Sequence, residues 1–194
     1  MSNVTLAEFR AWARLDVAVS DGVAQAAIDA AEESINDHLG RQVELAGDTA
    51  TERTFVPDGD SPVLRIHDCT EITLVEDNGV TVPSDAWQAE PVNGIDSTGQ
   101  EVPYSQIRLL AGSWTALYNN QATVTITARW GWASLPSRYK QAVMIAAADL
   151  LQQADVRNGV IGYAGDYAVR VKSNPAVTQL LRKLRRAESW GVGR

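Results

Sequence analysis

The chain has 194 residues, of which 45% are hydrophobic and 21% charged, a composition typical of a folded domain rather than a disordered chain. No apolar run approaches the roughly 20 residues that span a bilayer, and the segment from Met1 to Thr5 has neither the basic nor the apolar region of a signal peptide. The single cysteine, Cys69, excludes an intrachain disulfide. We therefore expect a protein that is made and kept in a cytosol.

The net charge of -7 is unevenly distributed along the chain. Residues 1–100 hold 19 acidic and 5 basic side chains, a balance of -14, whereas residues 101–194 hold 5 acidic and 12 basic side chains, a balance of +7. Such asymmetry is typical of a protein with two surfaces for different partners. The alternative is that acidic loops gather in the first part only to keep it soluble.

Two helices are expected at the start of the chain. Thr5 and Glu8 have the spacing of a capping box, which predicts a helix that begins after Thr5. Asp21 is the expected N-cap of the second helix, and Gly40 is its expected end. The second helix has an apolar stripe at steps of three and four residues: Ala24, Ala27, Ile28, Ala31, Ile35 and Leu39. The short linker between the helices predicts a hairpin.

Strand patterns replace helical ones from about Val43 to Trp130. Leu64 with Ile66, and Ile72 with Leu74, alternate with polar neighbours, as half-buried strands do. The dipeptide Asn78-Gly79 suits a type I′ hairpin turn after the second of these pairs. Thr123–Trp130 is the clearest predicted strand, because its apolar residues share one face: Val124, Ile126, Ala128 and Trp130.

Helices return after Pro136. The third expected helix has a buried stripe that includes Tyr139, Ala142, Val143, Ala146 and Ala147. Asn174 as N-cap and Pro175 in the first turn predict a fourth helix, with Val177, Leu180, Leu181 and Leu184 on its inner face. We therefore predict an α+β fold, in which a helical hairpin at 1–42 and helices at 134–194 form a four-helix core around an antiparallel β-sheet insert at 43–133.

No catalytic or metal-binding pattern is recognisable. His38, His67 and Cys69 have no spacing that would close a zinc site, and the acidic loop at Asp58 and Asp60 lacks the EF-hand ligand pattern, so a polar turn is its ordinary interpretation. No nucleophile elbow is present. The glycine-rich segment 157–168 is not followed by Lys-Ser or Lys-Thr, as a phosphate-binding loop would be. We expect neither an enzyme nor a cofactor.

The basic end of the chain is the first candidate for a binding site. Its candidate residues are Arg182, Lys183, Arg185, Arg186 and Trp190. One interpretation is a C-terminal helix whose cations favour the negative end of the helix dipole. A second is docking on an acidic protein surface with Trp190 as the anchor, and a third is contact with nucleic acid.

Two further groups are candidates for contacts between subunits or with partners. Trp130 and Trp132 lie at the end of the predicted strand, where they either cap the sheet core or serve an interface. The glycine-rich loop is a possible inter-subunit or partner loop, through Gly159, Gly162, Tyr163, Gly165 and Tyr167.

Together these segments resemble the phage head-to-tail connector (adaptor) family of neck proteins. The resemblance rests on residue types in three stretches: Leu6–Asp16 with Ala27–Arg41, Val63–Ile66 leading into Ile72–Gly79, and Ala128–Trp132 with Leu135–Ala142. These stretches follow the order of the family over most of the chain. Short family members lack so long a middle, so the role of residues 43–130 does not carry over.

The resemblance implies a structural role in the virion neck, at the junction between head and tail. Family members form a homo-oligomeric ring, a dodecamer in the virion, beneath the portal protein, and extend the DNA channel toward head-closure or tail proteins. The basic segment would then dock on the portal. Genomic DNA would pass through the channel without sequence-specific binding, helped by an acidic lining that repels phosphate. No membrane is involved.

Two other functions stay open from the residues alone. The first is a DNA-binding module that uses the basic C-terminal helix. The second is a small hydrolase with an active site shared between subunits, which would depend on His38 or His67.

Overall fold

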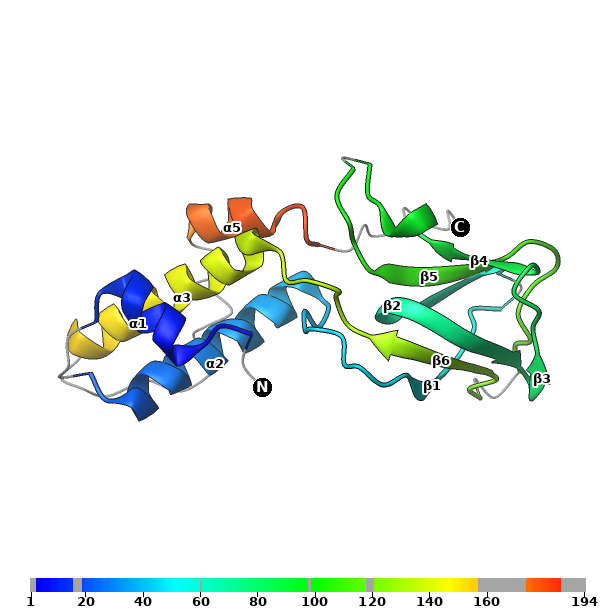
Figure 1. Ribbon diagram of the computed structural model, residues 1–194, viewed down its shortest axis with the longest axis horizontal. Helices are drawn as coiled ribbons and strands as arrows, with labels where there is room; N and C mark the ends of the chain where they lie inside the picture. The colour runs from blue at the N-terminus through cyan, green and yellow to red at the C-terminus, as the bar shows by residue number, and fades with distance from the viewer. Residues whose placement is uncertain are drawn as a thin grey trace. The chain divides into compact units, whose positions relative to one another are not determined.

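A computed structural model describes residues 3–15, 19–59, 61–97, 99–117, 121–156 and 174–185. The chain divides into two compact units, a helical unit of residues 1–42 and 135–194 and a sheet unit of residues 43–134 (Figure 1). The fold is α+β, as predicted. Among the described residues, no helix combines the length and the apolar character that a membrane span needs.

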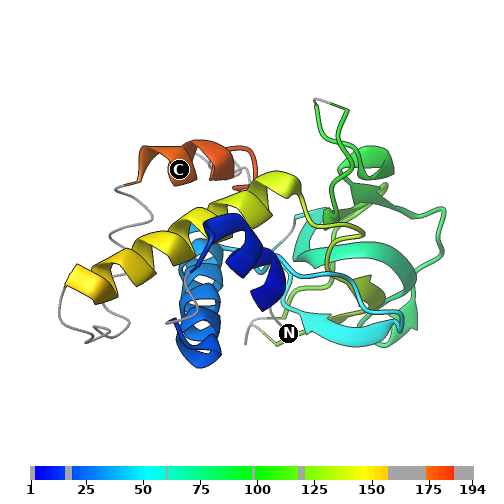
Figure 2. The same ribbon diagram turned by 60° about the vertical axis from the view of Figure 1, so that its left-hand side comes forward.

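The described part of the helical unit contains four α-helices: α1 (Leu6–Ala13), α2 (Asp21–Leu39), α3 (Ser137–Val156) and α5 (Pro175–Leu181). Helix α2 packs against α3, and α5 lies on α3 in both views (Figures 1 and 2). The predicted stripes of α2 and α3 form the core between them, and Phe9 of α1 is also buried. The four predicted helices are therefore all present.

The helix ends follow from local chemistry. The predicted capping box is confirmed, because the Thr5 hydroxyl accepts a hydrogen bond from the Glu8 N–H at 3.2 Å and the Glu8 carboxylate accepts one from the Thr5 N–H at 2.9 Å. The predicted N-cap of α2 is wrong by one residue. Ser20, in an extended conformation, accepts from the Val23 N–H, while Asp21 lies in the first turn, where a carboxylate favours the helix dipole. Gly40 ends α2 with a φ of 64°, as predicted.

The sheet unit is built on one antiparallel sheet with the strand order β1-β6-β2-β5-β4, and β3 also pairs with β2. The strands are β1 (Thr51–Phe55), β2 (Val63–Asp77), β3 (Val80–Thr81), β4 (Trp87–Glu90), β5 (Tyr104–Leu109) and β6 (Val124–Trp130). A short 3-10 turn, η1 (Val92–Gly94), follows β4.

Strand β2 organises the sheet because each of its halves has a different neighbour. Residues 63–69 pair with β5 and residues 69–77 pair with β6, with register shifts at both pairings. Such shifts bend a strand and change the direction of its side chains. The two halves of the sheet therefore face each other across one hydrophobic core, which includes Leu64 and Ile107 from one half and Val75 and Ile126 from the other.

Two sequence predictions for the sheet are confirmed. Residues along β6 alternate between buried and half-buried, with Val124, Ile126, Ala128 and Trp130 on the core side. Asn78 and Gly79 have φ values of 50° and 77°, as a type I′ turn requires, and they connect β2 to β3.

Candidate interaction surfaces

The two histidines and the cysteine lie on two elements of the chain. His38 lies in the last turn of α2, while His67 and Cys69 lie in β2 of the sheet unit. His67 is exposed and contacts Arg53 (Nη1 to Nδ1, 3.0 Å), whereas Cys69 is fully buried. Burial, followed by the nearby Asp68 carboxylate, raises the pKa of the Cys69 thiol to about 12, so the thiol is not a ready nucleophile. Among the described residues, no group of three His, Cys, Asp or Glu side chains could hold a metal ion.

The two tryptophans at the end of β6 are buried inside the sheet unit. Trp130 is 6% exposed and its indole N–H donates to the Thr51 carbonyl at 2.8 Å, while the Arg53 guanidinium lies 4.7 Å from the centre of its ring. Trp132 is 3% exposed and its indole N–H donates to Asp68 Oδ2 at 3.1 Å. Of the two interpretations of these rings, this geometry agrees with capping of the sheet core.

Asp68 is a buried structural residue that the sequence pattern does not indicate. Its carboxylate accepts the hydrogen bond from the Trp132 indole, and its backbone carbonyl accepts one from the Gly131 N–H at 2.7 Å. Trp132 in turn pairs with Leu45 in an isolated parallel bridge, which places the entry and exit segments of the sheet unit side by side. Because a single Asp before a Cys has no periodic signal, only the fold reveals this role.

The basic C-terminal segment follows α5 and is not part of it. The predicted helix continued past Leu184, but α5 ends at Leu181, after which the Leu184 N–H bonds back to the Leu181 carbonyl in a tighter turn. Arg182, Lys183 and Arg185 are exposed there, and Leu184 is buried as predicted. Arg186 and Trp190 lie outside the described residues.

Two contacts hold this basic segment to the rest of the helical unit. Asn174 caps α5 through the N–H groups of Ala176 and Val177, as predicted, and its amide also donates to Asp149 of α3 at 2.6 Å. Arg41, just after α2, donates to the Leu184 carbonyl at 3.3 Å. The exposed cations therefore lie on backbone that is hydrogen-bonded to the rest of the helical unit.

The glycine-rich loop with Gly159, Gly162, Tyr163, Gly165 and Tyr167 lies outside the described residues.

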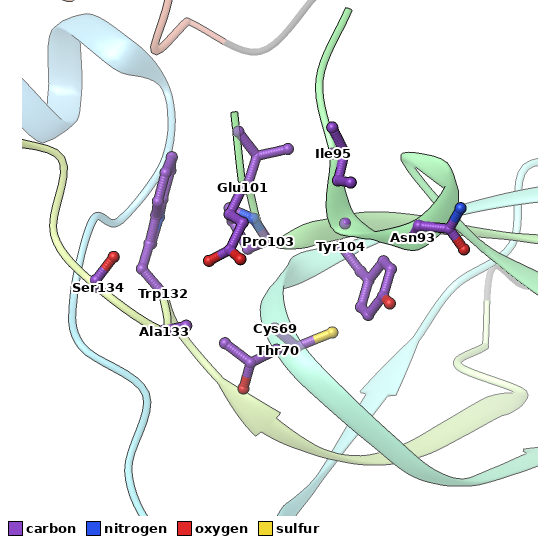
Figure 3. Close-up of a pocket in the computed structure, with 12 residues that line it drawn as sticks. Cys69, Thr70, Asn93, Ile95, Glu101, Pro103, Tyr104, Trp132, Ala133 and Ser134 are labelled. Carbon is purple, nitrogen blue, oxygen red and sulfur yellow. The ribbon is translucent and has the colours of Figure 1, made fainter. Parts of the chain in front are cut away.

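A cleft of about 200 Å³ opens in the sheet unit beside the start of β5 (Figure 3). Trp132 forms one wall, and Ile95, Glu101 and Tyr104 lie on the other sides (Figure 3). The segment between β4 and β5 is held as a small hairpin, since Ile95 pairs with Glu101 and the Val102 N–H donates to the Gly94 carbonyl at 2.8 Å. No sequence motif indicated this cleft.

No protein-family model and no curated protein sequence matches the chain. Solved structures do match it. A chain from the neck of an empty GTA particle, computed with C6 symmetry, aligns with a TM-score of 0.60 at 17% identity, over 98% of this chain and 93% of the other. A chain from the virion of a native gene transfer agent (GTA) particle gives 0.56 at 18% identity, over 97% and 92%.

A further chain, from the neck of a native GTA particle computed with C12 symmetry, aligns with a TM-score of 0.54 at 20% identity, over 97% of this chain and 91% of the other. Each alignment includes both the helical unit and the β-rich middle, because it spans nearly the whole of both chains. This protein therefore has the fold of chains from the neck of gene transfer agent particles, in agreement with the resemblance to phage neck proteins that its sequence carries.

Proposed function

We propose that this protein is a structural subunit of the neck of a tailed phage or phage-like particle. Copies of it form a ring beneath the portal, extend the DNA channel and receive the head-closure or tail proteins. The observation that carries this proposal is the shared fold with neck chains over nearly the full length of the protein. Two of those necks were computed with C6 and C12 symmetry, which supports a cyclic arrangement, with twelve copies in the virion.

Docking on the portal is assigned to the basic segment after α5. Arg182, Lys183 and Arg185 are exposed on a base fixed by Asn174 and Arg41, and Arg186 and Trp190 follow in the sequence. Such a cluster suits an acidic docking surface, with an aromatic anchor of the kind common at binding hot spots. The role is structural, and genomic DNA passes through the channel without sequence-specific binding.

Ring formation and portal binding can be measured on the full chain. Native mass spectrometry of the protein, alone and mixed with the portal protein of the same particle, is expected to show a ring that binds the portal. The charge reversal Arg182→Glu with Lys183→Glu is expected to weaken portal binding and its salt dependence, while leaving the ring intact. Arg14→Glu, at an exposed position of α1's C-terminal cap, is the control and is expected to bind normally.

Two results would count against parts of this proposal. A wild-type protein that stays monomeric with and without the portal contradicts the neck function itself. If portal binding changes neither with salt concentration nor with the charge reversal, only the assignment of docking to the basic segment is contradicted.

The alternative is a DNA-binding module, favoured by the same exposed cations after α5. Electrostatic binding to duplex DNA would weaken steeply as salt increases, because phosphate contacts release counterions. A gel-shift titration of the isolated protein at several salt concentrations separates the two functions. Tight binding to duplex DNA that the double charge reversal abolishes would favour the module over the passive channel.

A further inference from the structure

The cleft in the sheet unit has one charged side chain in its lining, and that side chain is a carboxylate. Of the described residues that line the cleft, Glu101 alone carries a charge, since none of them is a lysine, an arginine or a histidine. Figure 3 shows the Glu101 carboxylate directed into the space between Trp132 and Tyr104. The cleft therefore presents a negative charge to its occupant.

The Glu101 carboxylate has no counter-ion on its own chain. Within the described ranges it takes part in no ion pair and no side-chain hydrogen bond, whereas Glu90 of β4 is paired with Arg108 at 2.7 Å. An occupant that covers a carboxylate strips it of water, which is costly unless the occupant supplies a positive charge. A neutral or an anionic occupant is therefore disfavoured.

The uncharged part of the lining suits an aliphatic stem. Tyr104 is half-buried, so part of its ring is accessible, and the buried Trp132 and Pro103 close the inner side of the cleft. The Thr70 hydroxyl is engaged elsewhere, since it donates to the Arg129 carbonyl at 3.3 Å. A long basic side chain has the same division, with an apolar stem and a charged head.

The size of the cleft also favours a single side chain. Its volume is about 200 Å³, whereas clefts that hold cofactors and drug-sized ligands have about 300–1,000 Å³. A metal ion is a poor match as well, because the described residues offer no group of three His, Cys, Asp or Glu side chains. The best match is therefore one cationic side chain.

The wall that carries Glu101 is already ordered. Ile95 pairs with Glu101 in a β-bridge, and within the turn between them the Asp96 carboxylate accepts a hydrogen bond from the Gln100 N–H at 3.0 Å. On the opposite wall, the indole hydrogen bond of Trp132 holds that ring in place. Because these groups are fixed before binding, an occupant loses little affinity to the ordering of the cleft.

We propose that the cleft binds an arginine side chain of a partner protein, with the guanidinium on Glu101 and the aliphatic stem against Tyr104. Arginine is favoured over lysine because its planar guanidinium both pairs with a carboxylate and stacks on an aromatic ring. This binding site belongs to the sheet unit alone. It goes beyond the proposed neck function and does not depend on it.

Saturation-transfer NMR on the full chain can measure this binding, because the method detects weak ligands of large proteins. The first ligand is n-butylguanidinium, which reproduces the stem and the head of arginine, and the second is n-butylurea, which has nearly the same shape without the charge. The wild type is expected to bind n-butylguanidinium about threefold to tenfold more tightly. Added salt is expected to reduce this preference, because it screens the attraction of unlike charges.

Two variants at Glu101 test its role. Glu101→Gln removes the charge at nearly constant size and is expected to bind both ligands equally weakly. Glu101→Lys places an ammonium there and is expected to bind n-butylguanidinium more weakly still. Glu52→Gln is the matched control, because Glu52 is exposed on β1 and is absent from the described lining, and it is expected to keep the wild-type preference. Far-UV circular dichroism checks that each variant is folded.

Three outcomes would overturn the proposal. The first is equal binding of n-butylguanidinium by the wild type and Glu101→Gln, and the second is an equal loss of binding in Glu52→Gln. The third is a capped Ala-Arg-Ala tripeptide that does not bind, or spermidine that binds more tightly than n-butylguanidinium in a Glu101-dependent way, since a free polyamine would then be the occupant. None of these measurements needs the ring or the portal, so each of these outcomes leaves the neck function standing.

Discussion

Replacing Gly131 by alanine tests how the sheet unit holds its entry and exit segments side by side. Gly131 has a φ of 116°, a backbone conformation that residues with a Cβ rarely adopt. A Cβ atom on Gly131 would lie 2.7 Å from the Ala46 nitrogen and 2.8 Å from the Glu44 carbonyl oxygen. Both of these are backbone atoms. They cannot rotate away as a side chain would, so the segment 44–46 has to move.

The expected loss of stability follows from the two hydrogen bonds that this movement would break. The Trp132 N–H donates to the Glu44 carbonyl at 2.8 Å, and the Ala46 N–H donates to the Trp132 carbonyl at 2.9 Å. Loss of these two hydrogen bonds costs about 1 kcal/mol each. The unfavourable φ costs about 1–3 kcal/mol more. We expect Gly131→Ala to lower the free energy of unfolding by about 3–5 kcal/mol, and the melting temperature by roughly 10 °C.

Urea unfolding followed by tryptophan fluorescence measures this loss. Four of the six tryptophans belong to the sheet unit, so the signal reports mainly on it. Gly47→Ala is the control, because a Cβ at Gly47 would meet nothing within 4 Å, and it is expected to change stability by less than about 0.5 kcal/mol. A Gly131→Ala protein as stable as Gly47→Ala would refute the close packing of segments 44–46 and 131–132.

Two further predictions concern titratable groups of the sheet unit. Hydrogen bonds from Arg108 (2.7 Å), and then from Gln106, hold the pKa of Glu90 below its ordinary value of 4.5, despite the opposing effect of burial. Because the folded pKa of Glu90 is lowered, its ionised carboxylate stabilises the protein above about pH 4.5, and this stabilisation is lost as the pH falls through the folded pKa. Glu90→Gln should therefore make the loss of stability below about pH 4.5 less steep, as acid unfolding followed by circular dichroism can measure. An unchanged slope contradicts this. The Cys69 thiol, with its raised pKa and full burial, should react with a thiol reagent at mildly alkaline pH only after unfolding, and rapid labelling of the native protein would contradict its burial.

Helix ends and the regular strand could be predicted because their determinants are local. The capping box at Thr5, the glycine end at Gly40 and the Asn174 cap each depend on neighbouring residues only. The alternation of buried and half-buried residues along β6 could also be predicted, because no register shift interrupts the pairing of β6 with β1. The N-cap of α2 was misplaced because Ser20 and Asp21 are both good caps, and a first-turn carboxylate also favours the helix dipole.

Strand β2 shows where periodicity fails. The sequence pattern predicts two strands in which Ile72 and Leu74 share the buried face. In the structure both lie on one strand of 15 residues, and a register shift between them exposes Leu74, while Val75 is fully buried. One extra residue reverses the direction of every side chain that follows it. Such a shift depends on pairing with distant strands and leaves no signal in the local sequence.

The same non-local geometry decides which side chains remain available for partners. Tryptophan is a residue type that is enriched at interfaces. In this protein, however, the chain turns at Gly131, which has a positive φ, and the indole N–H groups of Trp130 and Trp132 both donate hydrogen bonds to acceptors inside the sheet unit. Aromatic residues with a satisfied N–H and almost no exposed area contribute stability and little contact area. Among the described residues of the sheet unit, the exposed large apolar side chains are instead aliphatic, as at Val80 and Ile95. A contact made by the described part of the sheet unit would therefore draw on exposed aliphatic side chains, and these two indoles would stabilise the unit that presents them.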